Sequence, residues 1–146
     1  MTVVAYKSGT MCSDSMVSTG SGFNDGSVRK IIKTPEGFLV GAAGNLSHVS
    51  QILDTFEDYD TDYIWEHCVE ELSKLDEVEA LLVTPDEILV FVDGYFSPVK
   101  ADFYALGNGS PVAKGAMAMG ATAEEATEIA IRFTLGCGGD IQKVEL

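Results

Sequence analysis

The sequence predicts an α+β domain built as a four-layer αββα sandwich, in which two antiparallel sheets lie between two layers of helices. Three observations lead to this prediction. The expected elements run in the order strands, two helices, strands, two helices and a final strand. Short turn sequences such as Asp93-Gly94 join successive strands, as in hairpins. The 146 residues have the length of one domain, so we expect a single domain over residues 1–146.

The first part of the chain is expected to form strands. β-branched and apolar residues fill these segments, and Gly- or Pro-containing turns such as Ser8-Gly9 separate them. Residues 18–27 are rich in Gly, Ser, Asn and Asp, which predicts a loop. The fourth segment is almost entirely apolar, so we expect both of its faces to be covered. The four strands are expected over Thr2–Tyr6, Thr10–Asp14, Val28–Lys33 and Phe38–Ala43.

The rest of the chain is expected to hold two pairs of helices, with four strands between the pairs and one strand at the end. Apolar residues at helical spacing predict helices over Asn45–Phe56 and Asp62–Leu75. Pro111 can open a third helix that runs to Met119, and Thr122 with Glu125 forms a capping box for a fourth. The remaining strands are expected over Ala80–Thr84, Glu87–Val92, Tyr95–Lys100, Phe103–Leu106 and Asp140–Leu146.

Composition excludes several classes of partner. With 9 Lys and Arg against 23 Asp and Glu, the formal charge of −14 disfavours binding to nucleic acid and to anionic membranes. No apolar run approaches the length of about 20 residues that spans a bilayer, and the N-terminus lacks the pattern of a secretory signal. Three cysteines without a CxxC pair indicate neither a disulfide framework nor a zinc knuckle. We therefore expect a cytoplasmic protein.

Thr2 is the residue best suited to act as a nucleophile. Aminopeptidases generally remove Met1 when the next residue is as small as threonine, so we expect Met1 to be removed and Thr2 to become the mature N-terminus. Its α-amine, with a reference pKa of about 7.7–8.0, could then take the proton of its own hydroxyl. This route activates a threonine nucleophile without a histidine. Many proteins begin with Met-Thr, however, and most of these have no such activity.

Such a nucleophile needs supporting groups, and the sequence offers candidates. A cation near the amine disfavours the protonated amine, a carboxylate holds that cation, and backbone N–H groups stabilise the oxyanion. Lys30 is expected in mid-strand, Asp14 at a strand end, Gly44 at the end of the apolar strand and Asp140 after a Gly-rich turn. Each also fits an ordinary structural role, and their spacing alone does not show that they converge.

The order of these residues resembles proteasome β-subunits, and most closely the bacterial proteasome-like peptidase that works under a heat-shock AAA+ unfoldase. These proteins are N-terminal-nucleophile hydrolases with an αββα sandwich fold. The resemblance extends over nearly the whole chain, and its segments are weak singly but specific in this order. The segments are Thr2–Ala5, Ser13–Ser15, Val28–Lys30, Phe38–Gly44, Ala105–Ala113 and Gly138–Asp140.

The resemblance implies a role for each matched position. Thr2 would be the nucleophile, Lys30 would tune its amine, Asp14 would hold Lys30, and the Gly44 N–H would bind the oxyanion. Asp140 matches a supporting acid. Asn108 stands where the family often has a serine beside the amine, and Ser110 follows two residues later. Gly41 and Asn45 would shape the substrate pocket, and the carbonyls of Gly139, Gln142 and Glu145 match those that bind a structural Na+ or Mg2+ ion.

The implied function is that of a threonine-type endopeptidase that needs no cofactor for its chemistry. Family members form stacked homo-oligomeric rings, and an AAA+ ATPase unfoldase feeds protein substrates into them. Two alternatives stay open on the sequence. One is a non-catalytic ring or scaffold homologue, since Asn108 lacks the hydroxyl that could relay a proton. The other is a small-molecule amidase on the same fold.

Overall fold

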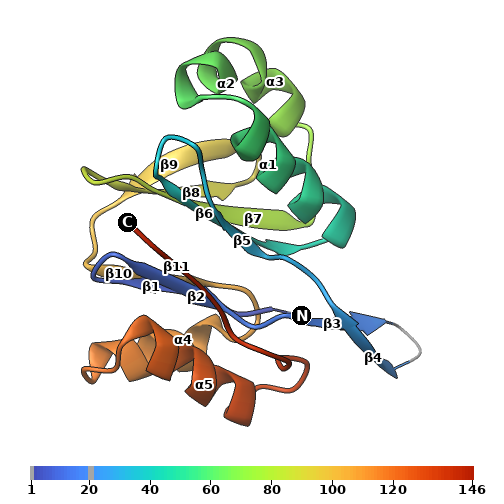
Figure 1. The fold of residues 1–146 in the computed structure, drawn as a ribbon, viewed down its shortest axis with the longest axis vertical. Helices are drawn as coiled ribbons and strands as arrows, with labels where there is room; N and C mark the ends of the chain where they lie inside the picture. Colours follow the sequence, from blue (N-terminus) through green and yellow to red (C-terminus); the bar gives the residue numbers. More distant parts are fainter. Residues whose placement is uncertain (1, 20–21) are drawn as a thin grey trace.

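Two antiparallel sheets form the centre of the computed structural model, which describes residues 2–19 and 22–146 (Figure 1). The first sheet has the strand order β10-β1-β2-β11. Strand β1 pairs with β2 in the register Val4 to Ser13, and with β10 in the register Val4 to Leu106. The strands of this sheet are β1 (Val4–Lys7), β2 (Thr10–Ser13), β10 (Phe103–Leu106) and β11 (Gln142–Glu145).

The second sheet has the strand order β5-β6-β7-β8-β9, so each strand pairs with its neighbour in the chain. Its register places Gly44, at the end of β6, opposite Val78 at the start of β7. Short turns join β5 to β6, β7 to β8 and β8 to β9, as the turn signals predict, whereas the helical segment 46–72 connects β6 to β7. Its strands are β5 (Ile31–Lys33), β6 (Leu39–Gly44), β7 (Val78–Val83), β8 (Ile88–Val92) and β9 (Tyr95–Val99).

The two sheets face each other across a shared apolar core. Val4 and Met11 from the first sheet pack with Leu39, Leu81 and Val90 from the second, and all five are nearly inaccessible to solvent. Burial of this apolar surface is the main force that holds the sheets together. As a result, the end of β6 lies close to the start of β1, and residues from both sheets can share one site.

Helices cover the outer faces of both sheets. Helix α1 (Leu46–Asp58), α2 (Thr61–His67) and α3 (Val69–Leu72) contribute to the core on the second sheet, where Ile52 and Phe56 are 1% exposed. Helices α4 (Ser110–Ala118) and α5 (Ala123–Phe133) cover the first sheet through small residues such as Ala126. Figure 1 shows the resulting order of helices, sheet, sheet and helices. None of the helices in the described part of the chain has the length and apolar character to span a bilayer.

Three local predictions need correction. Most of the loop expected over residues 18–27 belongs instead to a hairpin of β3 (Met16–Thr19) and β4 (Gly22–Ser27), while residues 20–21 lie outside the described residues. The single helix expected over Asp62–Leu75 is interrupted at Cys68, which caps both α2 and α3. The strand expected over Val28–Lys33 begins only at Ile31, so Lys30 lies directly before it.

Candidate active site

A buried ion pair lies beneath the N-terminus. Lys30 Nζ is 2.9 Å from Asp14 Oδ1, and the two side chains are 1% and 0% exposed. Asp14 Oδ1 also accepts from the Val3 N–H at 3.1 Å, and Oδ2 accepts from the Gly138 N–H at 3.1 Å. Lys30 Nζ donates a further bond to the Met16 carbonyl at 2.9 Å. These bonds offset the cost of burying two charges, and they tie the pair to the residue next to Thr2.

A Gly-Asn-Gly turn holds Thr2, which is 5% exposed. Its backbone nitrogen donates to Asn108 Oδ1 at 2.9 Å, and its carbonyl accepts from the Gly109 N–H at 3.1 Å. The Asn108 amide is oriented in turn, because Nδ2 donates to the Leu135 carbonyl at 3.2 Å. Gly107 has a φ of +87°, and a Cβ there would lie 2.0 Å from the Thr2 carbonyl oxygen. Only glycine allows the turn to approach Thr2 this closely.

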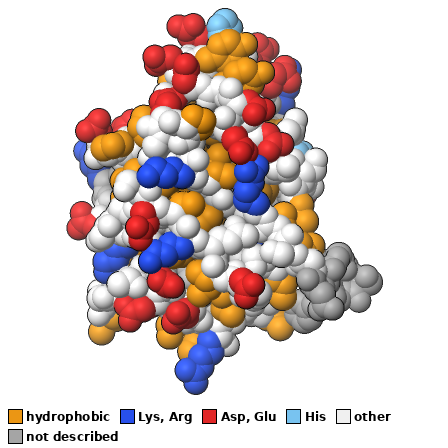
Figure 2. Space-filling view, viewed as in Figure 1, with side chains coloured by type: hydrophobic (Ala, Val, Ile, Leu, Met, Phe, Trp, Pro, Cys, Tyr) orange, Lys and Arg blue, Asp and Glu red, His pale blue; other side chains and the backbone are white. Residues whose placement is uncertain are grey.

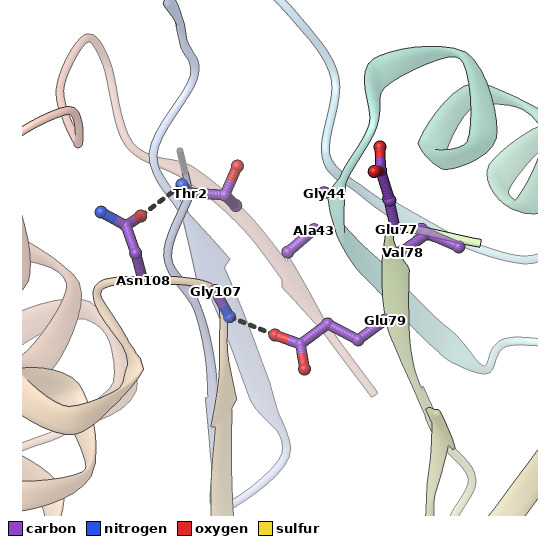
Figure 3. A pocket seen from close by; sticks show the side chains of 8 residues that line it. All are labelled: Thr2, Ala43, Gly44, Glu77, Val78, Glu79, Gly107 and Asn108. Atoms are coloured by element: carbon purple, nitrogen blue, oxygen red, sulfur yellow. Dashed lines mark hydrogen bonds between the residues drawn. The ribbon is translucent and has the colours of Figure 1, made fainter. Parts of the chain in front are cut away.

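A cavity of about 410 Å³ opens beside Thr2. Figure 3 shows Thr2, Gly107 and Asn108 on one side, and the end of β6 with the start of β7 on the other. The cavity therefore lies between the two sheets, at the end where the chain begins. Its lining residues are Thr2, Ala43, Gly44, Glu77, Val78, Glu79, Gly107 and Asn108.

Gly44 joins the end of β6 to helix α1 at the wall opposite Thr2. Its φ is +124°, and a Cβ there would lie 2.2 Å from the Glu77 carbonyl oxygen. Asn45 caps the helix, since its side chain accepts from the Ser47 and His48 N–H groups. The N-terminus of a helix carries partial positive charge. The Gly44 backbone and this helix end can therefore stabilise a developing oxyanion, whereas Glu77 and Glu79 add carboxylates to the same wall.

The structure brings together only some of the residues that the sequence singled out. Thr2, Gly44 and Asn108 line the cavity, and Lys30 with Asp14 lies beneath it. Ser110 is the first residue of α4 and does not line the cavity. The side chain of Asp140 is exposed, and its carbonyl accepts from Ser15 Oγ at 2.7 Å. Its carboxylate therefore does not extend into the site.

The two residues expected to shape a substrate pocket have structural positions instead. Gly41 is buried between the sheets, where a Cβ would lie 2.7 Å from Val4 Cγ1. It admits the side chain of Val4 and does not line the cavity. Asn45 lies next to Gly44, but its side chain is used to cap α1. Gly41 lies on the same face of β6 as Ala43, which does line the cavity, but two residues further from it, where Val4 and Met11 cover it.

The three carbonyls expected to bind a cation do not converge within this chain. Gly139 lies in a turn, whereas Gln142 and Glu145 belong to β11 and pair with Ser13 and Thr10. Carbonyls three residues apart in a strand point in opposite directions and lie about 10 Å apart, too far for one ion. The Gln142 side chain bridges the backbone, since Oε1 accepts from the Lys30 N–H and Nε2 donates to the Val28 carbonyl. Within residues 2–19 and 22–146, no three His, Cys, Asp or Glu residues form a metal-binding group.

Sequence reasoning missed the contribution of β7. Glu79 lines the cavity, and its Oε1 accepts from the Gly107 N–H at 2.6 Å. The bond crosses from one sheet to the other, between residues 28 positions apart. In the sequence, Glu79 is an ordinary polar residue near a strand terminus, and no local signal marks it.

Cys137 places a thiol next to Asn108, on the Thr2 side of the cavity. Its Sγ lies 3.8 Å from Asn108 Oδ1, and burial raises its pKa from 9.0 to about 11, with a further increase from the charge of Asp14. The thiol therefore stays protonated at neutral pH and acts as a weak donor to Asn108. Since only a thiolate is strongly nucleophilic, Thr2 is the better candidate nucleophile in this cavity.

No family model matches the sequence, and no curated protein sequence matches it. Solved structures do match it. BPH from Thiobacillus denitrificans has a TM-score of 0.73 and 20% identity over 99% of this chain and 96% of that chain. The same protein in complex with epoxomicin gives 0.70 and 21%, over 99% and 97%. Eukaryotic HslV from Trypanosoma brucei gives 0.71 and 20%, over 99% of both chains. The chain has the fold of BPH and HslV. The resemblance to proteasome-like peptidases that the sequence indicates is thus confirmed at the level of the fold.

Proposed function

We propose that this protein is a threonine-type endopeptidase with the four-layer αββα fold of the N-terminal-nucleophile hydrolases. One observation carries the proposal. Thr2 lines a cavity with its nitrogen held by Asn108, and the buried Lys30–Asp14 pair is bonded to the next residue. A nucleophile, its own base and a neighbouring cation are therefore in one place.

Activation of Thr2 follows from these positions. Met1 lies outside the described residues, and its removal would convert the Thr2 nitrogen into a free α-amine. Lys30 Nζ and the Val3 N–H share the acceptor Asp14 Oδ1, so the lysine charge lies close to that amine. The charge of Lys30 disfavours protonation of the amine, which leaves the amine lone pair free to accept the hydroxyl proton. Asn108 Oδ1 accepts a hydrogen bond from one N–H of the amine and so orients its lone pair.

The reaction then proceeds through an ester intermediate. Thr2 Oγ attacks the peptide carbonyl carbon while its proton passes to the amine. The carbonyl oxygen becomes an oxyanion, which the Gly44 backbone and the N-terminus of α1 stabilise. Collapse of this intermediate breaks the C–N bond, and the leaving nitrogen takes the proton from the ammonium. Water, deprotonated by the same amine, then hydrolyses the ester and restores Thr2.

We extend the proposal to the assembly. A homo-oligomeric stacked ring, fed with protein substrates by an AAA+ ATPase in the cytoplasm, fits the fold and the exposed aromatic side chains. Tyr59, Tyr63 and Trp65 on and beside α2 are 46%, 44% and 39% exposed, and Phe133 at the end of α5 is 65% exposed. Contiguous patches of exposed apolar side chains are typical of protein–protein contacts. The chemistry needs no cofactor, and a structural Na+ or Mg2+ ion would need ligands other than the three carbonyls expected from the sequence.

One observation favours a second candidate, a non-catalytic homologue of the same fold. The group beside the Thr2 nitrogen is the amide of Asn108, which accepts a hydrogen bond but has no hydroxyl to relay a proton. A scaffold subunit could retain the fold and this hydrogen bond without turnover. A small-molecule amidase would use the same Thr2 chemistry on a smaller amide.

Intact mass after incubation with a peptide epoxyketone tests the proposal. The Thr2 hydroxyl adds to the ketone and the free amine opens the epoxide, so the chain gains the full inhibitor mass and nothing leaves. We expect one adduct on a chain that begins at Thr2, and none on the Thr2→Ala variant, which should also lose peptide cleavage but assemble normally. A chain that begins at Thr2 and takes no adduct would support the non-catalytic candidate.

A further inference from the structure

We propose that Glu79 makes this cavity select a lysine or arginine side chain on the acyl side of the cleaved peptide bond. The inference rests on the proposed function and adds the substrate class. It follows from the charge, the position and the apolar surroundings of the Glu79 carboxylate.

The lining of the cavity carries charge of one sign. Glu77 and Glu79 are its acidic residues, and no lysine or arginine belongs to the described residues that line it. The nearby cation, Lys30, is 1% exposed and bonded to Asp14 beneath the cavity. A cationic side chain that enters the cavity would therefore meet carboxylates, and an acidic side chain would be repelled.

The Glu79 side chain is directed into the cavity, whereas the Glu77 side chain is not (Figure 3). Oε1 of Glu79 accepts from the Gly107 N–H at 2.6 Å, which fixes the carboxylate next to the turn that holds Thr2. Figure 3 shows the Glu79 side chain extending across the cavity towards Gly107, whereas the Glu77 side chain points away from it. A carboxylate that is already oriented loses little entropy when it pairs with a ligand. Glu79 is therefore the residue expected to set specificity.

The surroundings of Glu79 also suit a long basic side chain. Ala43 and Val78 contribute apolar surface to the same cavity. Lysine and arginine have aliphatic stems that pack on such surface while their charged ends bind a polar group. A leucine would gain the apolar contact alone, and it would have to desolvate the Glu79 carboxylate without pairing it.

Two epoxyketones that differ only in the side chain at this position, arginine or leucine, test the inference. The rate of adduct formation is followed by intact mass on chains that begin at Thr2. We expect the arginine inhibitor to react about tenfold faster or more, the effect of one charge-assisted hydrogen bond. In Glu79→Gln, whose amide oxygen can still accept from Gly107, this preference should disappear, because the arginine inhibitor loses its ionic partner and the leucine inhibitor no longer has to desolvate a carboxylate.

Glu87→Gln is the matched control, because it removes the same charge from the turn directly before β8, where Glu87 lines a different cavity. This variant should keep the preference for the arginine inhibitor. Loss of the preference in Glu87→Gln would assign the effect to net charge and overturn the role of Glu79. Two further results would overturn the inference and leave the proposed function standing. One is a leucine inhibitor that reacts faster than the arginine inhibitor with the wild-type chain, and the other is an equal fall in rate for both inhibitors in Glu79→Gln. Absence of any adduct with both inhibitors would overturn the proposed function, and the inference with it.

Discussion

The Lys30–Asp14 pair is the residue-scale feature on which stability and chemistry both depend. Each partner is almost fully buried, and Asp14 also accepts from two backbone N–H groups. Removal of one partner leaves an uncompensated charge in the core, which is far more costly than the loss of a surface pair.

We expect Lys30→Met to lower the free energy of unfolding by about 3–5 kcal/mol and to abolish peptide cleavage, because the Thr2 amine would lose its neighbouring charge. Denaturant unfolding and a peptide assay measure the two effects. Lys143→Met is the control, since Lys143 is 44% exposed and pairs with Glu124 at 3.4 Å, so its loss should cost less than about 1 kcal/mol. Full cleavage by Lys30→Met would contradict the proposed role of the lysine.

At the scale of elements, the junction between β6 and α1 shapes one wall of the cavity. Gly44 takes a φ of +124° there and is packed against the Glu77 carbonyl, while Asn45 caps the helix. An added Cβ must displace Glu77 and the start of β7, which carries Val78 and Glu79. Strain at this junction therefore passes directly to the cavity.

Gly44→Ala is expected to reduce peptide cleavage at least tenfold and to destabilise the fold by about 1–3 kcal/mol. Thr122→Ala gives a comparison with similar loss of stability, about 1 kcal/mol, because it removes the capping box of α5 far from the cavity. Cleavage by Thr122→Ala should match wild type at temperatures where both chains are folded. Equal activity of the two variants would show that the junction tolerates displacement.

The elements themselves were largely predictable, and the site was only partly so. Periodicity and turn residues located both sheets and the helices, because these signals are local. The β3–β4 hairpin was missed because its residues are polar and glycine-rich, the composition of a loop. Lys30 and Asp14 were candidates by residue type, but only the resemblance placed them in one site. Glu79 was not found, since the pairing of β6 with β7 and the approach of Gly107 are long-range contacts.

At the scale of the whole molecule, charge opposes association. The formal charge is −14, and Figure 2 shows acidic side chains spread over the visible face from the helices α1–α3 at the top to the helices at the bottom. Copies of this chain therefore repel one another over distances comparable to the Debye length, about 30 Å at 0.01 M salt and about 8 Å at 0.15 M. Apolar contacts must overcome this repulsion in any ring.

Self-association is accordingly expected to strengthen as salt screens the charge. Sedimentation velocity at constant protein concentration should show a larger assembled fraction in 300 mM than in 20 mM sodium chloride. Sodium sulfate at matched ionic strength, which also strengthens apolar association, should give an equal or larger fraction. Dissociation with rising salt would mean that ion pairs hold the assembly together instead.

The burial of Thr2 has a consequence for the order of events in the life of the chain. Its nitrogen is bonded to Asn108 and its carbonyl to Gly109, within a residue that is only 5% exposed. An aminopeptidase that removes Met1 must also bind the residue that follows it, and in the folded chain Thr2 is held through both its nitrogen and its carbonyl. Trimming of the terminus is therefore expected to precede closure of the turn, so competence for catalysis would be decided during synthesis, before the domain is complete.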